Sequence, residues 1–475
     1  MEDLFLIVDC ETDSLNPFYG QPLSFSAKVI RGREVVDEIS LKCRVESSRL
    51  PSPKALYVNG FSRHDLSHAM PLRDMMMALH KFIQKHQPIT ICAYNAKFDF
   101  NFAFSHYYQS LVTPDIYQWK TENRVICGLE ILKSIFVFRP DLKYIHIPFT
   151  LFDAPSFKLE HVCRENGFHF NFHDATEDVN ALHEVLELMK AESPAIVSQA
   201  IKCSNKSYVK SLISDNPFFC VAFGSGEDLS ARVLTPMAFD STGNNILCCD
   251  ISAVDPSKVA GISSWEIYLQ SKKISIDSWI IRVPINQGKV FFGPEALDLS
   301  GYNLSKCNLE ELKRRSVAAK RNLHFKEACK DAFAFYSDMF SDSISDNAIE
   351  KSMFRGFLDY REKQFIKQFN ELPWQDRWAF AENNSDLKTD NRVIRLAKKT
   401  ILEYDHLLAP KQTQKDYINY CNNRLFNINA ADTLPWNNIC SALKELDELK
   451  ENYPNEISRI KEIESYFDER MAVIY

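Results

Sequence analysis

Short apolar runs separated by polar turns mark the start of the chain. Residues 4–11, LFLIVDCE, form an apolar run bounded by polar residues, which is typical of a strand buried in a sheet. Residues 24–30 and 34–43 alternate apolar and polar side chains on either side of an Arg-Gly-Arg turn, and this predicts a hairpin. The opening segment is therefore predicted to supply three strands.

Helical and strand-like patterns then alternate. Residues 72–86 have helical spacing, Pro88 precedes the strand-like run ITICAY, and the pattern turns helical again over 98–108. A group of strands followed by alternating helices and strands predicts an α/β domain with a mixed sheet.

The helix predicted over residues 174–189 has the strongest pattern. Asp174, with Glu177 three residues later, is a suitable N-cap, and Ser193-Pro194 follows the last apolar position. We therefore place a domain boundary after residue 193. The apolar residues on one face of this helix are Ala175, Val179, Leu182, Leu186 and Met189.

The pattern changes twice after this helix. Between about 200 and 300, short runs such as FFCVAF and WIIRVPI stand between turn-forming groups, which predicts a small β-rich domain. Beyond about 306 nearly every window has helical spacing, with a soft boundary in the Ser-Asp-rich stretch 341–346. We predict three domains, over residues 1–193, 194–345 and 346–475.

Composition narrows the class of protein. With 475 residues, 45% of them hydrophobic and 25% charged, the chain has the balance of a multidomain globular protein. Thirteen cysteines without a C-x-x-C pair predict reduced thiols in a cytoplasmic protein. No apolar run reaches the roughly 18 residues that a membrane-spanning helix needs, and the N-terminus lacks the pattern of a signal peptide.

A net charge of −7 does not exclude a nucleic-acid ligand, because such binding needs only a local basic track. The densest basic stretch runs from Lys313 to Lys326. It is equally consistent with a solvated helix face.

Paired acids end the first predicted strand. Asp9 and Glu11 are two residues apart, so their side chains leave the same face of the sheet. Two carboxylates on an apolar strand repel each other and resist burial, and a divalent cation such as Mg²⁺ relieves that repulsion.

Three more groups follow at wide spacing. Asp99 opens a helix that follows a strand, where ligand sites of α/β sheets collect. His173 lies on the loop before the helix at 174, and Asp178 lies just inside that helix, so the two can converge. A nearly neutral imidazole on a loop suits a general base.

Together, Asp-x-Glu-Thr, an Asp about 90 residues on and His-x4-Asp about 75 residues later resemble the motif set of the DEDDh exonucleases. The resemblance implies that His173 and Glu11 are catalytic, His173 activating the water. It also implies two Mg²⁺ ions, which Mn²⁺ can replace. The implied metal ligands are Asp9, Glu11, Asp99 and Asp178.

The chain further resembles the bacterial exonuclease I family over nearly its whole length. Supporting segments include APSFKLEH at 154–161, Glu165-Asn166-Gly167 and Phe138-Arg139-Pro140. The resemblance implies an RNase H-like exonuclease domain, an SH3-like β-rich domain and an all-α C-terminal domain that close into a clamp. It implies processive 3′→5′ degradation of single-stranded DNA to 5′-mononucleotides, in DNA repair or recombination, by a monomer.

The same resemblance suggests contact residues. Arg139 matches a basic position of the pocket that binds the C-terminal tail of single-stranded DNA-binding protein, whereas Gln199 replaces an aromatic position of that pocket. Phe18 and Tyr19 are further candidates for stacking on bases. The residues expected to contact the DNA strand are Thr12, Asn95, Phe102, Lys206 and Arg355.

Three alternatives stay open. The same chemistry can act on RNA or on other 3′ ends, although an oligoribonuclease would stop some 280 residues earlier. A catalytically silent strand-binding protein would lack one of the carboxylates, and all are present. His173-Asp174 and His64-Asp65 also spell the pair of the HD phosphohydrolases, but those enzymes are all-helical and need further histidines.

Overall fold

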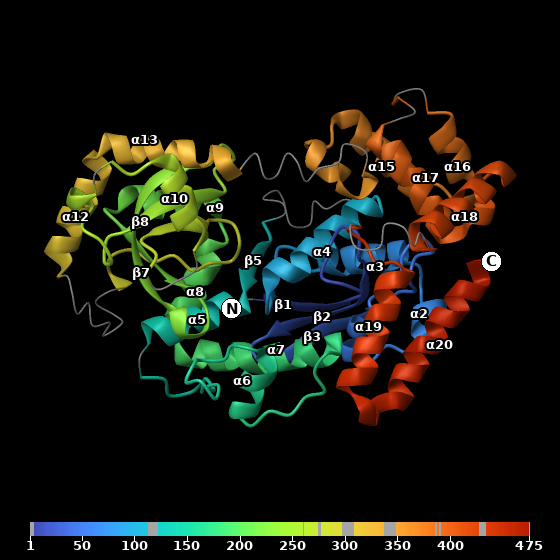
Figure 1. The fold of residues 1–475 in the computed structure, drawn as a ribbon, viewed down its shortest axis with the longest axis horizontal. Helices are drawn as coiled ribbons and strands as arrows, with labels where there is room; N and C mark the ends of the chain where they lie inside the picture. The colour runs from blue at the N-terminus through green and yellow to red at the C-terminus, as the bar shows by residue number, and fades with distance from the viewer. Residues whose placement is uncertain are drawn as a thin grey trace.

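A computed structural model describes the chain apart from the two ends and several internal segments. A five-stranded mixed sheet lies at the centre of the molecule, with strand order β3-β2-β1-β4-β5 (Figure 1). Strand β1 pairs antiparallel with β2 and parallel with β4, so the predicted hairpin and mixed sheet are both confirmed. The described residues are 4–112, 122–139, 141–259, 261–273, 277–296, 308–336, 348–384, 387–388, 391–426 and 434–474. The strands are β1 (Leu4–Thr12), β2 (Pro22–Arg31), β3 (Glu34–Lys42), β4 (Thr90–Ala93) and β5 (Arg124–Cys127).

Helices cover both faces of this sheet, because strand β1 is apolar on both. Phe5 and Ile7 point into one core with α5 and α7, whereas Leu6 and Val8 point into another with α3 and α4. The alternation follows from the period of two in a strand. The helices of this part are α1 (Pro53–Asn59), α2 (Arg63–His68), α3 (Leu72–Lys85), α4 (Ala96–Gln109), α5 (Gly128–Phe138), α6 (Leu159–Glu165) and α7 (Ala175–Glu192).

The predicted N-cap of α7 is confirmed. The Asp174 side chain accepts hydrogen bonds from the backbone N–H groups of Thr176 and Glu177. The helix ends at Glu192, but α8 begins at once with Pro194 at its first turn, where a missing N–H costs nothing. Helices therefore open the segment that the sequence pattern assigned to the β-rich domain.

A second, antiparallel sheet with strand order β6-β7-β8-β9 follows, and Figure 1 shows it beside the central sheet. Residues of β6 and β7 share one hydrophobic core with α5, α7 and α8. Packing thus continues across residue 193, and the proposed domain limits stay predictions. The elements here are α8 (Pro194–Cys203), α9 (Lys206–Asp215), β6 (Phe219–Phe223), η3 (Gly226–Asp228), β7 (Ser230–Phe239), β8 (Asn245–Asp250), η4 (Pro256–Lys258), α10 (Ser264–Lys272), β9 (Ile280–Pro284), α12 (Leu309–Arg321) and α13 (Leu323–Ala332).

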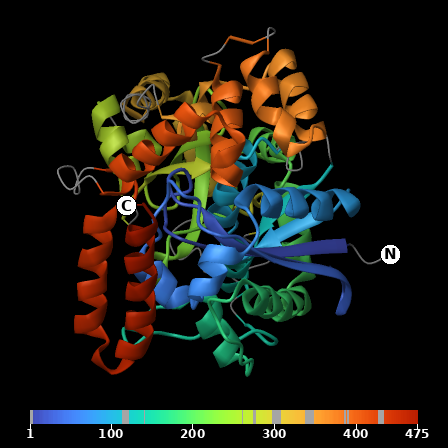
Figure 2. The same cartoon turned by 90° about the vertical axis from the view of Figure 1, so that its right-hand side faces the viewer.

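The described residues from 348 onward are helical, as predicted. They lie on the side of the central sheet that is opposite the second sheet (Figure 1). Helices α19 and α20 run side by side (Figure 2) and pack on α1 and α2. The predicted boundary at 341–346 lies outside the described residues. The elements are η5 (Ile349–Arg355), α15 (Tyr360–Glu371), α16 (Trp374–Glu382), α17 (Arg392–Asp405), η6 (His406–Leu408), α18 (Lys411–Phe426), α19 (Ile439–Asn452), η8 (Pro454–Glu456) and α20 (Ile457–Ile474).

Two further predictions concern the whole chain. The cysteines that the structure describes are free thiols, nearly all of them buried. Within the described residues, no helix combines the length and the apolar character needed to cross a bilayer.

Candidate active site

Three carboxylates meet where β1 faces the start of α7. Asp9 and Glu11 continue the side of β1 that carries Ile7, which is the side packed against α7. Asp178 lies in the first turn of α7, held there by the Asp174 cap. The ligand atoms of Asp9, Glu11 and Asp178 all lie within 4.8 Å of one another, a spacing that can hold a metal ion. Three of the four carboxylates that the resemblance implied as metal ligands thus lie together.

The environment of these acids disfavours their charged forms. Burial, followed by the nearby Asp99 and Glu11 carboxylates, raises the pKa of Asp9 well above its ordinary value. Burial and the Asp178 carboxylate raise the pKa of Glu11 to about 8. Burial likewise raises the pKa of Asp178 to about 6. Oxygen ligands that repel one another in this way fit a divalent cation, which would neutralise them.

Asp99 stands beside this cluster rather than within it. It lies in the first turn of α4 and is buried, and its Oδ1 accepts a hydrogen bond of 3.2 Å from the backbone N–H of Cys10. That N–H is available because the pairing of β1 with β4 ends at Ile7. Burial raises the pKa of Asp99 to about 7. A fourth ligand role for Asp99 stays a prediction.

His173 is exposed next to the carboxylates. Its backbone N–H donates to Asp178 Oδ2 at 3.2 Å, and its φ of 68° turns the chain sharply before α7. His173 and Glu11 line one small cavity of about 60 Å³. The preceding loop is anchored by Phe170 and Phe172, whose partly buried rings meet edge to face at 6.2 Å. His173 is therefore an exposed residue on an anchored loop beside the cluster.

A larger cavity of about 590 Å³ opens beside Glu11 and Thr12. Its aromatic walls are Tyr19 and Phe98 from the α/β part and Trp436 from the C-terminal part. The rings of Tyr19 and Trp436 lie 5.7 Å apart. A cavity of this size with a few polar groups suits one small ligand.

A third cavity, of about 870 Å³, shares Tyr19, Pro435 and Trp436 with the one beside Glu11, so the two are neighbours. Its lining is mainly basic, because it holds two acids, Glu350 and Asp416, against five cations, Lys351, Arg395, Lys398, Lys399 and Arg424. We call the two neighbouring cavities the groove. Sequence reasoning missed this basic wall, although Arg395, Lys398 and Lys399 are spaced to share one face of α17.

The stretch from Lys313 to Lys326 has different surroundings. Lys313 pairs with Glu310, and Arg314 and Arg315 both pair with Glu311, each within 2.9 Å. These helix pairs favour the interpretation of a solvated helix face for the first part of the stretch, because Lys313, Arg314 and Arg315 already face acids.

The residues that were predicted to contact the DNA strand do not lie together. Thr12 lines the groove, and its hydroxyl donates to the Ser14 carbonyl at 2.8 Å. Asn95 is exposed at the start of α4. Phe102 needs correction, because it is fully buried between sheet and helices and offers a base no surface.

Two of these residues lie away from the carboxylates. The Lys206 ammonium donates to Asn244 Oδ1 at 2.6 Å, which ties α9 to the turn before β8. Arg355 ends η5, and its side chain lies outside the described residues.

Arg139, which was predicted to contact the C-terminal tail of single-stranded DNA-binding protein, is half-buried. Arg139 follows the last turn of α5, and its N–H donates to the Ile135 carbonyl. Gln199 donates to the Phe291 carbonyl at 2.6 Å and accepts from the Tyr208 hydroxyl at 3.1 Å. Tyr208 thus places an aromatic ring next to Gln199, the residue that stands where the exonuclease I family has an aromatic side chain.

Comparisons with known proteins agree with this geometry. Residues 6–186 match the family model described as Exonuclease. Exodeoxyribonuclease I of Buchnera aphidicola subsp. Schizaphis graminum is 21% identical over 426 residues, which cover 88% of this chain and 86% of the relative.

Two solved structures align along the whole chain. E. coli exonuclease I in complex with a 5cy-dT13 oligonucleotide has a TM-score of 0.83 at 19% identity, covering 99% of this chain and 100% of the other. The ExoI/SSB-Ct complex has a TM-score of 0.81 at 19% identity, again covering 99% and 100%. This likeness establishes that the chain has their fold from end to end.

Proposed function

We propose that this chain, whose residues 6–186 form a domain of the exonuclease family and whose whole fold is that of exonuclease I, degrades single-stranded DNA in the 3′→5′ direction to 5′-mononucleotides. The observation that carries the proposal is the cluster of Asp9, Glu11 and Asp178 beside a groove with aromatic and basic walls. The relatives act on or were solved with such DNA, which supports the same substrate class here.

We infer that the cluster holds two Mg²⁺ ions, with Mn²⁺ as a substitute. Divalent ions held there would supply stabilisation of the attacking and leaving oxygens of a phosphodiester. Asp9, Glu11 and Asp178, with Asp99 beside them, would hold those ions, and binding would displace the protons that burial favours on these carboxyl groups. The His173 imidazole, on the open side of the cluster, accepts the proton of the attacking water.

The groove accounts for strand binding without sequence preference. Trp436, half-buried beside the buried Tyr19, offers a flat ring for stacking, which every base can satisfy. Lys351 and Arg395 offer cations to successive phosphates. The terminal nucleotide would occupy the cavity beside Glu11 while the preceding nucleotides stay in the basic part. A strand held in both cavities remains bound between cuts, which is the basis for processive degradation.

The partner and the location form part of the proposal. One similar structure is a complex with SSB-Ct, and we extend that interaction, with the C-terminal tail of single-stranded DNA-binding protein, to this chain through Arg139. Arg139→Ala should weaken binding of the tail peptide without changing cleavage of free DNA. A cytoplasmic location and a monomeric state complete the proposal; the free thiols support the former.

The test is a digestion of single strands labelled at the 3′ or the 5′ end, with and without chelator. Wild-type protein should release labelled mononucleotide from the 3′ end and degrade the 5′-labelled strand from that same end, and it should do so only when Mg²⁺ or Mn²⁺ is present. Asp178→Asn should abolish cleavage and keep strand binding, whereas Glu184→Gln, further along α7, should leave both intact. Normal turnover by Asp178→Asn would overturn the assignment.

The same assay separates the alternatives. Faster digestion of a matched RNA would favour an exoribonuclease, because the sequence and the groove do not exclude a 2′-hydroxyl. Binding without any product, in Mg²⁺ or Mn²⁺, would favour a silent strand-binding protein.

A further inference from the structure

The segment that follows the clustered carboxylates along the chain forms one wall of the groove. Residues 13–21 join β1 to β2, and we call them the β1–β2 loop. The loop starts two residues after Glu11, and its Leu15 and Tyr19 line the cavity beside Glu11. Its position therefore sets the shape of the cavity that the proposed function assigns to the terminal nucleotide.

Two buried side chains hold this loop through a single carbonyl. The Gly20 carbonyl accepts from Arg49 Nη1 and from His106 Nε2, the latter at 3.0 Å. Burial, followed by the Arg49 and Lys399 cations, lowers the pKa of His106 well below its ordinary value, so the imidazole is neutral and Nε2 carries the donated proton. A Cβ at Gly20 would collide with Ser14 Oγ, so the loop is closely packed on itself at this anchor.

Gln109 is a third anchor of the β1–β2 loop. Its Nε2 donates to the Phe18 carbonyl at 3.2 Å, and its Oε1 accepts from Arg49 Nη2 at 2.9 Å. Gln109 and His106 both belong to α4, the helix whose first turn carries Asp99. The helix that brings Asp99 to β1 thus also holds the loop that follows β1.

Arg49 makes contacts on three sides. Its Nε pairs with Glu46 Oε2 at 2.8 Å, while Nη1 and Nη2 donate to the Gly20 carbonyl and to Gln109 Oε1. The side chain is buried. A planar guanidinium can satisfy three acceptors in fixed directions, whereas the ammonium of a lysine is a point charge that cannot reach all three.

The same contacts extend to the basic cavity of the groove. Lys399 lines that cavity, and its ammonium lies 3.9 Å from Glu46 Oε2 and 3.5 Å from Gln109 Oε1. Glu46 and Gln109 are also the side chains that contact Arg49. Arg49 therefore links the loop beside Glu11 to a cation on the wall of the basic cavity.

We propose that Arg49 is a positioning residue for strand cleavage, which fixes the β1–β2 loop and so holds the terminal nucleotide over the clustered carboxylates. Arg49 lines neither cavity of the groove, so it acts through the loop. This role rests on the proposed function, because only a strand that is cleaved needs its terminus held there. A misplacement of about 1 Å near the reacting atoms can cost about 10²-fold in rate.

The direct test follows the terminal base of a bound strand. A single-stranded oligonucleotide with the fluorescent base 2-aminopurine at its 3′ end is titrated with the full chain in chelator, which prevents cleavage. We expect the wild-type chain to quench the terminal probe, because the loop and Trp436 enclose the base. Arg49→Lys keeps the charge but loses the fork, and it should lose most of that quench. The same probe at an internal position should behave alike in both proteins.

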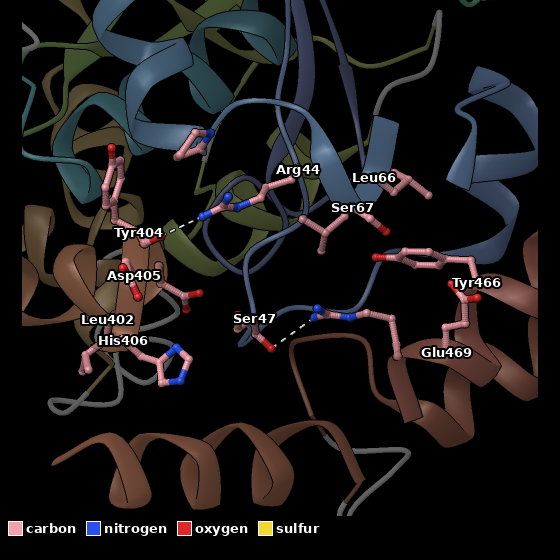
Figure 3. A pocket seen from close by; sticks show the side chains of 14 residues that line it. Arg44, Ser47, Leu66, Ser67, Leu402, Tyr404, Asp405, His406, Tyr466 and Glu469 are labelled. Carbon is pink, nitrogen blue, oxygen red and sulfur yellow. Dashed lines mark hydrogen bonds between the residues drawn. The ribbon is translucent and has the colours of Figure 1, made fainter. Parts of the chain in front are cut away.

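Two further variants define the role. Gln109→Glu keeps the acceptor for Arg49 but replaces the donor to the Phe18 carbonyl, so it should also lose most of the terminal quench. Arg44→Lys is the matched control. Arg44 donates from Nη2 to the Tyr404 carbonyl at 2.7 Å (Figure 3), so its side chain points to the C-terminal helices, and the control should behave as wild type. Urea unfolding checks that each variant is folded, and Gln109→Glu decides alone if Arg49→Lys does not fold.

Kinetics separate positioning from a structural role. In Mg²⁺, Arg49→Lys and Gln109→Glu should lower the turnover number by about 10–100-fold, with the dissociation constant of the strand in chelator within about threefold of wild type. An equal loss of turnover and affinity, a full terminal quench in the folded variants, or no quench by wild type would each refute the positioning role. Because the quench is measured without cleavage, a wild-type chain that quenches the terminal probe and cleaves nothing refutes only the proposed function.

Discussion

Neutralising Glu11 should stabilise the metal-free protein while it destroys the cation site. Glu11 holds its proton up to about pH 8 in the folded chain, because burial and the Asp178 carboxylate disfavour its charge. In the unfolded chain the same group titrates near the ordinary value of 4.5. The folded state therefore binds more protons between these values, and its stability falls as the pH rises through them.

The magnitude follows from the two pKa values. Each pH unit between them removes about 1.4 kcal/mol from the free energy of unfolding. At pH 7 the wild-type chain in chelator has lost about 3 kcal/mol in this way, and at pH 5 only about 1 kcal/mol. Glu11→Gln carries no charge to bury, so it should be more stable than wild type by about 3 kcal/mol at pH 7, with most of the difference gone at pH 5.

The measurement is urea denaturation in chelator at pH 5 and pH 7, followed by tryptophan fluorescence. Addition of Mg²⁺ or Mn²⁺ should then stabilise wild type and not Glu11→Gln, since the ion relieves the repulsion that the substitution has already removed. Glu227→Gln, at an exposed position in η3, is the matched control and should show neither effect. A Glu11→Gln variant no more stable than wild type at pH 7 would refute the electrostatic account of the cluster.

Three further predictions address other parts of the proposal. His173→Ala should lower the turnover number by about 10²–10⁴, the range of general-base catalysis, and leave strand affinity in chelator unchanged; an equal loss in both would show a structural role instead. Trp436→Ala should weaken oligonucleotide binding by about 1–3 kcal/mol in fluorescence anisotropy, as loss of a stacking surface does, whereas Leu407→Ala, exposed on η6, should not. Arg392→Ala should cost about 3–5 kcal/mol in thermal or urea unfolding, because Glu362 would stay buried without its partner at 2.9 Å; a change below 1 kcal/mol would contradict that estimate.

Local pattern was enough for much of the α/β part. The apolar run that became β1, the hairpin of β2 and β3 and the cap at Asp174 were all predicted from residues close together in the chain. Strand alternation also placed Asp9 and Glu11 on one face. These features depend on periods of two and 3.6 residues and on cap chemistry, which a short window of sequence contains.

The local sequence pattern did not predict helices α8 and α9. They are short, and they lie before strongly apolar β-type runs that dominated the pattern of this part. Phe102 shows a different failure. The sequence near a catalytic motif does not show whether an aromatic side chain faces a ligand or the core. Phe102 is buried because the sheet and the helices pack around it.

The sequence by itself determined which elements form and which carboxylates share a strand face, because those properties follow from neighbours along the chain. Only the tertiary structure decided that Trp436 meets Tyr19 and that Phe102 is buried between sheet and helices. Contacts between residues hundreds of positions apart depend on how finished elements pack, and many packings are compatible with the same local pattern. The placement of Asp9 and Glu11 on one strand face was therefore predictable from the chain, whereas the shape of the groove was not.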